Sequence, residues 1–373
     1  MSSKPQANRT SSKKTTMLVE LITPEFKNHT LSVYAMGTVI AAQEVNLTSR
    51  ISGMVLKTNP NFVEGGILKK GEQIVSLDPT DYKLVIAQRK SDLEKARFNL
   101  KLEQGQQAIA LREFQLLGSK LAPQEKELVL RKPHLQAAKA ALNAAEASLK
   151  QAQLDLERTR PYSPFDAIVI SRNANVGSWI STFSTGTPLA KLVGIKNFWI
   201  DVSLPVDKLR WINVPGINSK KGASVRIAYE TGWGKGIYRQ GEITRLKASV
   251  EKEGRMAKLV VEVNDPLSQK PNNKNSPPLM LGTFVRLKIQ GHTLNNVAAL
   301  PESLLHEGNK LWLMTPDNKL AIHPVTPIWR EQGLVYFSID ALPQNTQIIK
   351  SNLSTPVQGM DLREATPVTK DNT

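Results

Sequence analysis

The chain of 373 residues contains no cysteine. This absence excludes a disulfide framework, a thiolate nucleophile, a cysteine-based zinc site and an acylated N-terminal cysteine. The histidines share no spacing typical of metal ligands or of a catalytic set. They are His29, His134, His292, His306 and His323. The sequence therefore predicts no metal site and no enzyme activity.

Long apolar runs are also missing. No uninterrupted stretch approaches the ~18 residues that a membrane-spanning helix needs. The polar, Ser/Thr/Lys-rich start lacks the apolar core of a secretion signal. We expect residues 1–16 to form a disordered linker and residues 367–373 a tail. Two histories are compatible with such a start: an anchor or signal that was removed, or none at all.

Positive charge dominates, with a formal net charge of +16. Lys and Arg are spread along the chain and are not gathered beside aromatic residues or in a reader motif, which argues against a nucleic-acid partner. An anionic membrane surface or an acidic protein partner fits this charge as well. The stretch Gly232–Gly236 lacks the helix start and the terminal Lys-Ser/Thr of a phosphate-binding loop, so we expect a β-hairpin tip there.

Two stretches with a seven-residue repeat occupy the middle of the chain. Alternating steps of three and four residues place such a repeat on one face of a helix. In the first stretch the two interleaved series are Ile86, Leu93, Leu100, Gln107 and Phe114, and Arg89, Ala96, Glu103, Ala110 and Leu117. In the second they are Leu135, Leu142, Leu149 and Leu156, and Ala138, Ala145 and Ala152.

These repeats predict an antiparallel coiled-coil hairpin within one chain. Folding back near residue 121 pairs positions whose numbers have a constant sum, such as Leu100 with Leu142 and Phe114 with Leu128. Gly118 can close the first helix and Pro123 suits the start of the second. Pro133 is expected to kink the second helix. The outer face is expected to be polar and solvated, from Lys90, Asp92, Glu94, Lys95, Lys139, Asn143, Glu146 and Lys150.

The segments on either side of the hairpin repeat one plan. Each has a short valine-containing strand, a turn with glycine and a closing apolar strand, for example Met54–Leu56 with Ile74–Leu77, and Ile168–Ile170 with Leu189–Val193. Two similar half-sheets interrupted by one insertion predict a single small β-sandwich with the hairpin at its tip.

This order of segments resembles the periplasmic adaptor, or membrane fusion, proteins of tripartite efflux pumps, in the hemolysin-D-like superfamily. The residues that carry the resemblance span about residues 37 to 365. They are Leu77-Asp78-Pro79, Thr159 to Asp166, Val176-Gly177, Phe198 to Val202, Leu281 to Leu287 and Ala299 to Leu305. One departure is Ala167, where the family pattern has glycine.

The resemblance implies a mainly β, elongated, multi-domain fold with a long coiled-coil hairpin. Its expected parts are a membrane-proximal β domain with connecting strands (17–45 and 292–366), a split lipoyl-like domain (46–79 and 160–196), the hairpin (80–159) and a β-barrel (197–291). In true lipoyl domains the acceptor lysine sits at the turn that joins the halves. The hairpin replaces that turn here, and Lys69 and Lys70 precede the last strand, so we expect no lipoyl or biotinyl cofactor.

The implied function is an adaptor that links an inner-membrane transporter, of the resistance-nodulation-division type, to an outer-membrane channel. The resemblance also implies a periplasmic location at the inner membrane and self-association into a ring of six. In the family an Arg, a Leu and a Ser near the hairpin tip contact the channel. Arg112 and Leu116 match, but the Ser position falls at Pro123, with Ser119 or Lys120 as substitutes. The expected docking tip is therefore Arg112, Leu116, Leu117, Gly118, Ser119 and Lys120.

The sequence also leaves three other functions open. An adaptor of an ATP-driven exporter or type I secretion system shares the same modules. A subunit of a lipoyl or biotinyl carrier enzyme comes next, and a nucleic-acid binder is the third reading.

Overall fold

The computed structural model describes residues 16–117, 122–182, 188–250, 254, 256–343 and 345–365. Strands outnumber helices by far, which confirms the predicted mainly β fold class. The chain forms two compact units. We call residues 38–200 and 262–284 the hairpin unit, and the described parts of residues 1–37, 201–261 and 285–373 the barrel unit.

The hairpin unit contains two small sheets that share one core. One sheet has the order β4-β10-β8-β6 and the other β7-β5-β9. Their strands are β4 (Glu44–Leu47), β5 (Gly53–Thr58), β6 (Ile67–Leu68), β7 (Val75–Leu77), β8 (Ala167–Arg172), β9 (Trp179–Ile180) and β10 (Ala190–Gly194). Alternate side chains of both sheets, among them Val55, Leu77, Val169 and Leu192, are buried in the common core.

The two halves of this sandwich exchange strands. β6 comes from the first half but pairs with β8 of the second, and β9 comes from the second half but pairs with β5 of the first. Backbone hydrogen bonds support both exchanges: Gly65 donates to the carbonyl of Val169 (2.8 Å), and Val55 donates to that of Ser178 (2.9 Å). Neither half therefore completes its own sheet.

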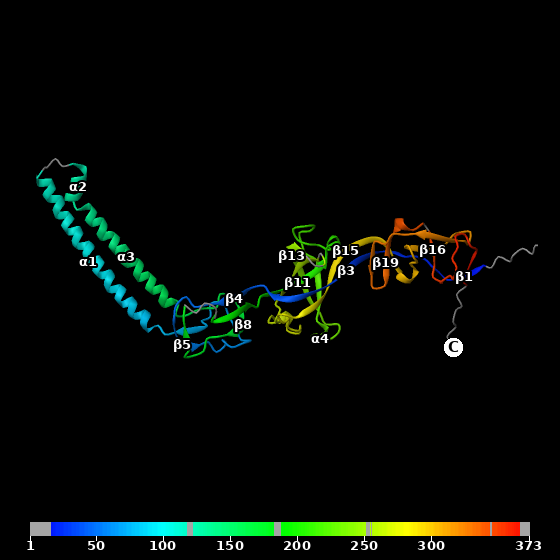
Figure 1. Cartoon of the computed structure of the whole chain (residues 1–373), viewed down its shortest axis with the longest axis horizontal. Coiled ribbons are helices and arrows are strands. Elements are labelled where there is room, and N and C mark those ends of the chain that lie inside the picture. The colour runs from blue at the N-terminus through cyan, green and yellow to red at the C-terminus, as the bar shows by residue number, and fades with distance from the viewer. Residues whose placement is uncertain are drawn as a thin grey trace, which may run out of the picture. The chain divides into compact units, whose positions relative to one another are not determined.

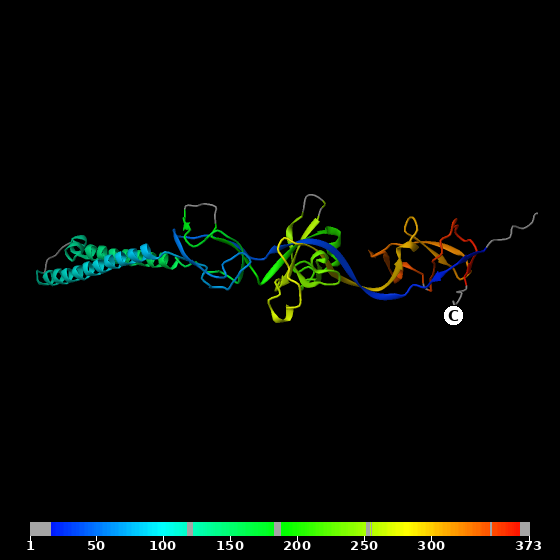
Figure 2. The ribbon, with the colours of Figure 1, turned by 90° about the horizontal axis from the view of Figure 1, so that it is seen from below.

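Three helices stand between β7 and β8 in the chain: α1 (Thr80–Leu117), α2 (Pro123–Val129) and α3 (Lys132–Glu157). α1 and α3 pack on each other and run side by side in both ribbon views (Figures 1 and 2). α1 begins where the Asp78 carboxylate accepts hydrogen bonds from the amide (2.9 Å) and hydroxyl (2.6 Å) of Thr80. These bonds lower the pKa of Asp78, and they satisfy a backbone donor that the helix itself cannot.

The barrel unit is built around six strands in the order β12-β13-β14-β11-β3-β15, closed by pairing of β12 with β15. The strands are β3 (Phe26–Ala41), β11 (Asn197–Pro205), β12 (Ser224–Ala228), β13 (Arg239–Val250), β14 (Met256–Asn264) and β15 (Phe284–Pro301). A short helix, α4 (Glu230–Trp233), connects β12 to β13, so Gly232–Gly236 contains a helical turn where a plain hairpin tip was expected.

The end of β15 continues into a second β region. There β15 pairs with β19 (Leu334–Ser338), and β19 with β18 (Trp329–Glu331). A further sheet has the order β17-β16-β20-β2, and β1 pairs in parallel with β21. Their bounds are β1 (Met17–Val19), β2 (Leu21–Ile22), β16 (Lys310–Met314), β17 (Leu320–Pro324), β20 (Gln347–Ile349) and β21 (Leu362–Glu364).

One expectation needs correction. The N-terminal segment was assigned as a whole to the last β domain and its connecting strands, but β3 supplies one of the six barrel strands. The proline- and asparagine-rich segment 266–278 forms a loop. It is organised by the buried carboxylate of Asp265, which accepts hydrogen bonds from the amides of Gln269 (2.9 Å) and Lys270 (3.1 Å) and from Asn273 Nδ2 (2.8 Å).

Candidate docking surface of the helical hairpin

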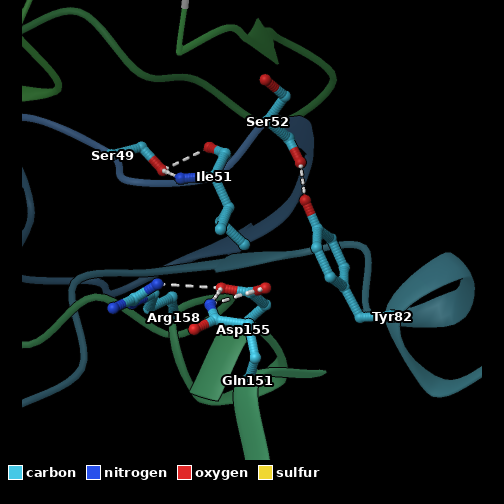
Figure 3. A network of polar contacts seen from close by, with 7 residues as sticks. All are labelled: Ser49, Ile51, Ser52, Tyr82, Gln151, Asp155 and Arg158. Atoms are coloured by element: carbon cyan, nitrogen blue, oxygen red, sulfur yellow. Dashed lines mark hydrogen bonds and ion pairs between the residues drawn. The ribbon is translucent and has the colours of Figure 1, made fainter. Parts of the chain in front are cut away.

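Polar contacts anchor the base of the hairpin to the sandwich (Figure 3). The hydroxyl of Tyr82, on the first turn of α1, donates to the carbonyl of Ser52 (2.7 Å), and its ring packs on the sandwich core. Burial, and to a lesser degree the charge of Asp155, raises the pKa of Tyr82. At the end of α3, Arg158 Nη1 donates to Asp155 (2.9 Å). The Arg158–Asp155 bond lies within the end of α3, whereas the bond of Tyr82 to Ser52 joins α1 to the sandwich and fixes how α1 leaves it.

Along both long helices, the side chains at the heptad positions are less exposed than most of their neighbours in the same helix. On α3 the seam positions Leu135, Leu142, Leu149 and Leu156 are partly buried, and Ala152 is buried. On α1 Leu93 is buried and Leu100 is partly buried. Arg89 differs from the expected seam, because it is exposed and forms an ion pair with Asp92 on its own helix (3.3 Å).

The second arm of the hairpin is broken, where a kinked continuous helix was expected. α2 ends at Val129, Arg131 takes a left-handed backbone conformation (φ 54°), and α3 begins at Lys132. Pro133 has no amide hydrogen, and its ring would collide with the carbonyl of residue 129 in a continuous helix, so the helix ends before it.

A bidentate ion pair holds the break against α1. Arg131 Nε donates to Glu103 Oε1 (2.7 Å) and Arg131 Nη2 donates to Glu103 Oε2 (2.8 Å), while Nη2 also reaches Gln106 Oε1 (2.7 Å). The guanidinium lowers the pKa of Glu103. Gln107 donates to the carbonyl of Leu130 (3.3 Å), whose side chain is buried. We call this set, Glu103, Gln106, Gln107, Leu130 and Arg131, the elbow.

Because of the elbow, the side chains of α2 that contact α1 near the tip differ from those expected. Leu128 was paired with Phe114 by the constant sum, yet Leu128 is 61% exposed. Lys126 lies over the ring of Phe114 instead, with Nζ 5.3 Å from the ring centroid. The break turns α2, so the apolar side chain that enters the interface is Leu130 and not Leu128.

The expected docking tip is described only in part. Arg112 is exposed, and it forms no ion pair with a described residue. Leu116, one turn later on the same side of α1, is 87% exposed. The side chain of Leu117 and the whole of Gly118, Ser119 and Lys120 lie outside the described residues.

A second apolar stripe runs along α1 on the side opposite the seam. It consists of Phe98 (66% exposed), Leu102 (53%), Ile109 (58%) and Leu116, separated by four or seven residues. With 3.6 residues per turn, this spacing keeps the four side chains on one outer face. We call this set the outer stripe. The polar residues expected on the outer face of α1, such as Lys90, Glu94 and Lys95, are exposed, and the outer stripe adds large apolar side chains that were not expected there.

The corresponding outer face of α3 carries small side chains. Ala137, Ala140, Ala144 and Ala147 are separated by three or four residues, which also keeps them on one helix face, and all four are exposed. The pair of helices thus has one edge with large apolar side chains and one edge with alanines. The repeat of the outer stripe was visible in the sequence, but the exposure of its side chains is shown only by the structure.

No chemical site accompanies these surfaces. Among the described residues, no cluster of His, Asp and Glu could hold a metal ion. The described helices include none that combines the length and apolar character of a bilayer-spanning segment.

The register of α1 against α3 can be tested in this chain because it has no cysteine. Cysteines introduced at Leu100 and Leu142 are expected to form a disulfide rapidly, whereas cysteines at Leu93 and Leu142, shifted by one heptad, are expected to stay reduced. The readout is the mobility of the oxidised chain on a denaturing gel. Equal disulfide formation by both pairs would show that the constant-sum register is wrong.

Known proteins have sequences similar to that of this chain. No protein-family model matches the chain. It is similar to the multidrug resistance protein MdtA of Yersinia pseudotuberculosis serotype O:3, with 24% identity over 338 residues that cover 89% of this chain and 72% of that protein. MdtA of Yersinia enterocolitica serotype O:8 is 22% identical over 342 residues, which cover 91% of this chain and 73% of that protein.

The same architecture occurs in a solved structure. MacA from Actinobacillus actinomycetemcomitans matches with a TM-score of 0.61 and 16% identity, over 89% of this chain and 100% of MacA. This likeness shows the fold. The sequence similarity to MdtA and the fold shared with MacA together confirm that this chain resembles the periplasmic adaptor, or membrane fusion, proteins of tripartite efflux pumps.

Proposed function

We propose that this chain is the adaptor subunit of a tripartite efflux pump. In this role it stands in the periplasm at the inner membrane and links an inner-membrane transporter of the resistance-nodulation-division type to an outer-membrane channel. The observation that carries the proposal is the insertion of a long helical pair, α1 with α3, between the two halves of a lipoyl-like sandwich. The name of the MdtA relatives supports a drug-exporting pump.

The hairpin then acts as a coiled-coil arm that docks on the channel with its tip. Arg112 and Leu116 support this assignment, because both are exposed and lie one turn apart on α1. An arginine beside a leucine can form a forked hydrogen bond with a carboxylate or with backbone carbonyls, and the leucine would shield that bond from water. Leu117, Gly118, Ser119 and Lys120 belong to the same proposed contact.

The two edges of the hairpin suggest how copies of the chain associate. Leu102 of the outer stripe stands at about the level of Ala140 on α3 when the helices pair in the expected register. A second copy placed alongside would fit the large side chains of one edge between the alanines of the other. Such a contact joins two different surfaces, so it can repeat and close into a ring. A ring of six, as in the family, is the assembly we propose.

The proposed role requires no bond chemistry by the chain itself. Its task is to seal and to couple two membrane proteins, so the residues that matter lie on contact surfaces. The sandwich supplies the β structure that holds the arm, and the bond of Tyr82 to Ser52 transmits the position of the sandwich to α1.

An accumulation assay tests the proposal. Cells that lack this chain are expected to accumulate a panel of fluorescent efflux substrates, and re-expression of the whole protein should restore export. A photoreactive residue at position 116 should then capture an outer-membrane protein in cells. Unchanged accumulation of every substrate in the deletion strain, together with no captured outer-membrane protein, would contradict the adaptor function.

A further inference from the structure

A basic groove lies on the outer wall of the barrel. It has a volume of about 270 Å³. Its lining comes from three neighbouring strands, β3, β12 and β15, and consists of Thr30, Leu31, Ser32, Ser224, Arg226, Lys288 and Gln290. The alternate residues Val225, Ile227, Leu287 and Ile289 are buried inside the barrel, so Arg226 and Lys288 project outward.

Two positive charges face each other in this groove. Arg226 on β12 is the direct cross-strand partner of Lys288 on β15. Like charges at directly opposite positions of an antiparallel pair repel each other and destabilise the sheet. An anion lying between the two side chains would relieve this repulsion.

No described carboxylate neutralises this pair. Glu230 forms an ion pair with Arg286, which lies two residues before Lys288 on β15, and the distance from Glu230 Oε2 to Arg286 Nη1 is 3.6 Å. Glu242 accepts a hydrogen bond from the amide of Gly222 (3.2 Å). Glu331 is almost enclosed, and it accepts from the amide of Ser32 (3.3 Å). Each neighbouring acid thus already has a partner, and none is within ion-pair distance of Arg226 or Lys288.

Aromatic rings restrict where the two cations can point. The guanidinium of Arg226 lies 5.1 Å from the ring centroid of Tyr238, and Lys288 Nζ lies 5.6 Å from that of Tyr34. The ring of Tyr34 is itself held by a hydrogen bond from Gln332 Nε2 to its hydroxyl (2.7 Å). Side chains that are already positioned lose less conformational entropy when they bind a ligand.

We propose that this groove binds a phosphate group. The fork of Arg226 and the ammonium of Lys288 supply charge, and the hydroxyl of Ser32 and the amide of Gln290 supply further hydrogen-bond donors. The Thr30 hydroxyl adds another when Thr293 is the donor of their shared hydrogen bond (2.9 Å), whereas the Ser224 hydroxyl already donates to Gln240 Oε1 (3.4 Å). A phosphate has more acceptor oxygens than a carboxylate and matches this number of donors better. Its source is either a free phosphate compound or the headgroup of an anionic lipid. The inference does not depend on the proposed efflux function.

The test compares two double variants of the full chain that remove the same charge. In the first, Arg226→Gln and Lys288→Gln empty the groove of cations. In the second, Lys310→Gln and Lys319→Gln remove two exposed lysines of the same unit outside the groove. Phosphate binding is followed by ³¹P NMR titration with inorganic phosphate, and lipid binding by flotation with phosphatidylglycerol and with phosphatidylcholine vesicles.

We expect saturable phosphate binding that weakens at least about tenfold in the groove variant and stays unchanged in the control variant. Phosphate should also raise the unfolding temperature of the unaltered chain but not that of the groove variant. Selective flotation with phosphatidylglycerol that is lost only in the groove variant would identify a lipid source, and its absence a soluble one. Loss of saturable phosphate binding in both variants alike, or no such binding by the unaltered chain, would overturn the proposal.

Discussion

Replacing Arg112 by aspartate is expected to reduce drug export to the level of cells that lack the protein. In the proposed contact the guanidinium donates to acceptors on the channel, and a carboxylate at the same place would repel them. The folded chain should tolerate the change, because Arg112 is exposed and forms no ion pair with a described residue. Accumulation of a fluorescent substrate in cells measures the effect.

Two further variants separate docking from general charge effects. Arg112→Lys keeps the charge but loses the fork, so partial export is expected. Lys101→Asp makes the same change of charge on an exposed position of the same helix, farther from the tip, and should export normally. If Arg112→Asp cells export normally with the protein present at its usual level, Arg112 has no docking role, and the contact must rest on Ser119, Lys120 or the backbone.

The second large effect is expected on self-association. Leu102→Ser together with Ile109→Ser removes two large apolar side chains from the outer stripe, each more than half exposed in the single chain. Complete burial of such a side chain contributes roughly 1.5–3 kcal/mol, and because about half of each is already covered in the single chain, association would add roughly 0.8–1.5 kcal/mol per residue. The double variant should therefore associate at least about tenfold more weakly. Sedimentation of the purified chain over a range of concentrations measures this change.

A matched control and a crosslinking pattern sharpen the test. Leu128→Ser with Val129→Ser removes two exposed apolar side chains from α2, outside the stripe, and should leave association unchanged. When a chain with Leu102→Cys is mixed with a chain with Ala140→Cys, we expect disulfides between the two kinds of chain. Disulfides that join only position 102 to position 102 would mean that the contact is two-fold symmetric and that the proposed ring contact is wrong.

The spacing of the helical arms could be predicted because it depends on local sequence. Leu135, Leu142 and Leu149 recur every seven residues, and that period alone places them on one face of a helix. The start of α1 also depends on local contacts, since the Asp78 carboxylate accepts hydrogen bonds from Thr80, two residues later. In both cases the residues that decide the outcome are neighbours in the chain.

The elbow could not be predicted in the same way. Pro133 is compatible with a kink and with a break, and the sequence does not decide between them. The break is held by Glu103, which is 28 residues before Arg131 and on another helix. Because the bent second arm brings Leu130 into the interface, the pairing of Leu128 with Phe114 was wrong although the heptads of α3 could be read.

In the β regions, too, only part of the structure could be predicted from the sequence. The resemblance implied strands in residues 17–45 but did not assign β3 to the barrel, since a half-buried strand looks the same in the barrel and in the last β domain. β6 and β9 have only two residues each, too few for any period to be visible. Their exchange between the sandwich halves is decided by tertiary pairing.

The exchange of β6 and β9 has a consequence for the order in which the chain folds. Residues 53–77 emerge early, but their sheet stays open until β9 arrives more than a hundred residues later. Closing so long a loop costs entropy that grows with its logarithm. The helices shorten that search, because a hairpin that zips from its tip brings the two ends together, and Leu77 does donate to the carbonyl of Thr159 (2.8 Å). Seam substitutions should therefore delay formation of the β core, and aggregation during synthesis would start from exposed strand edges far from the altered residue.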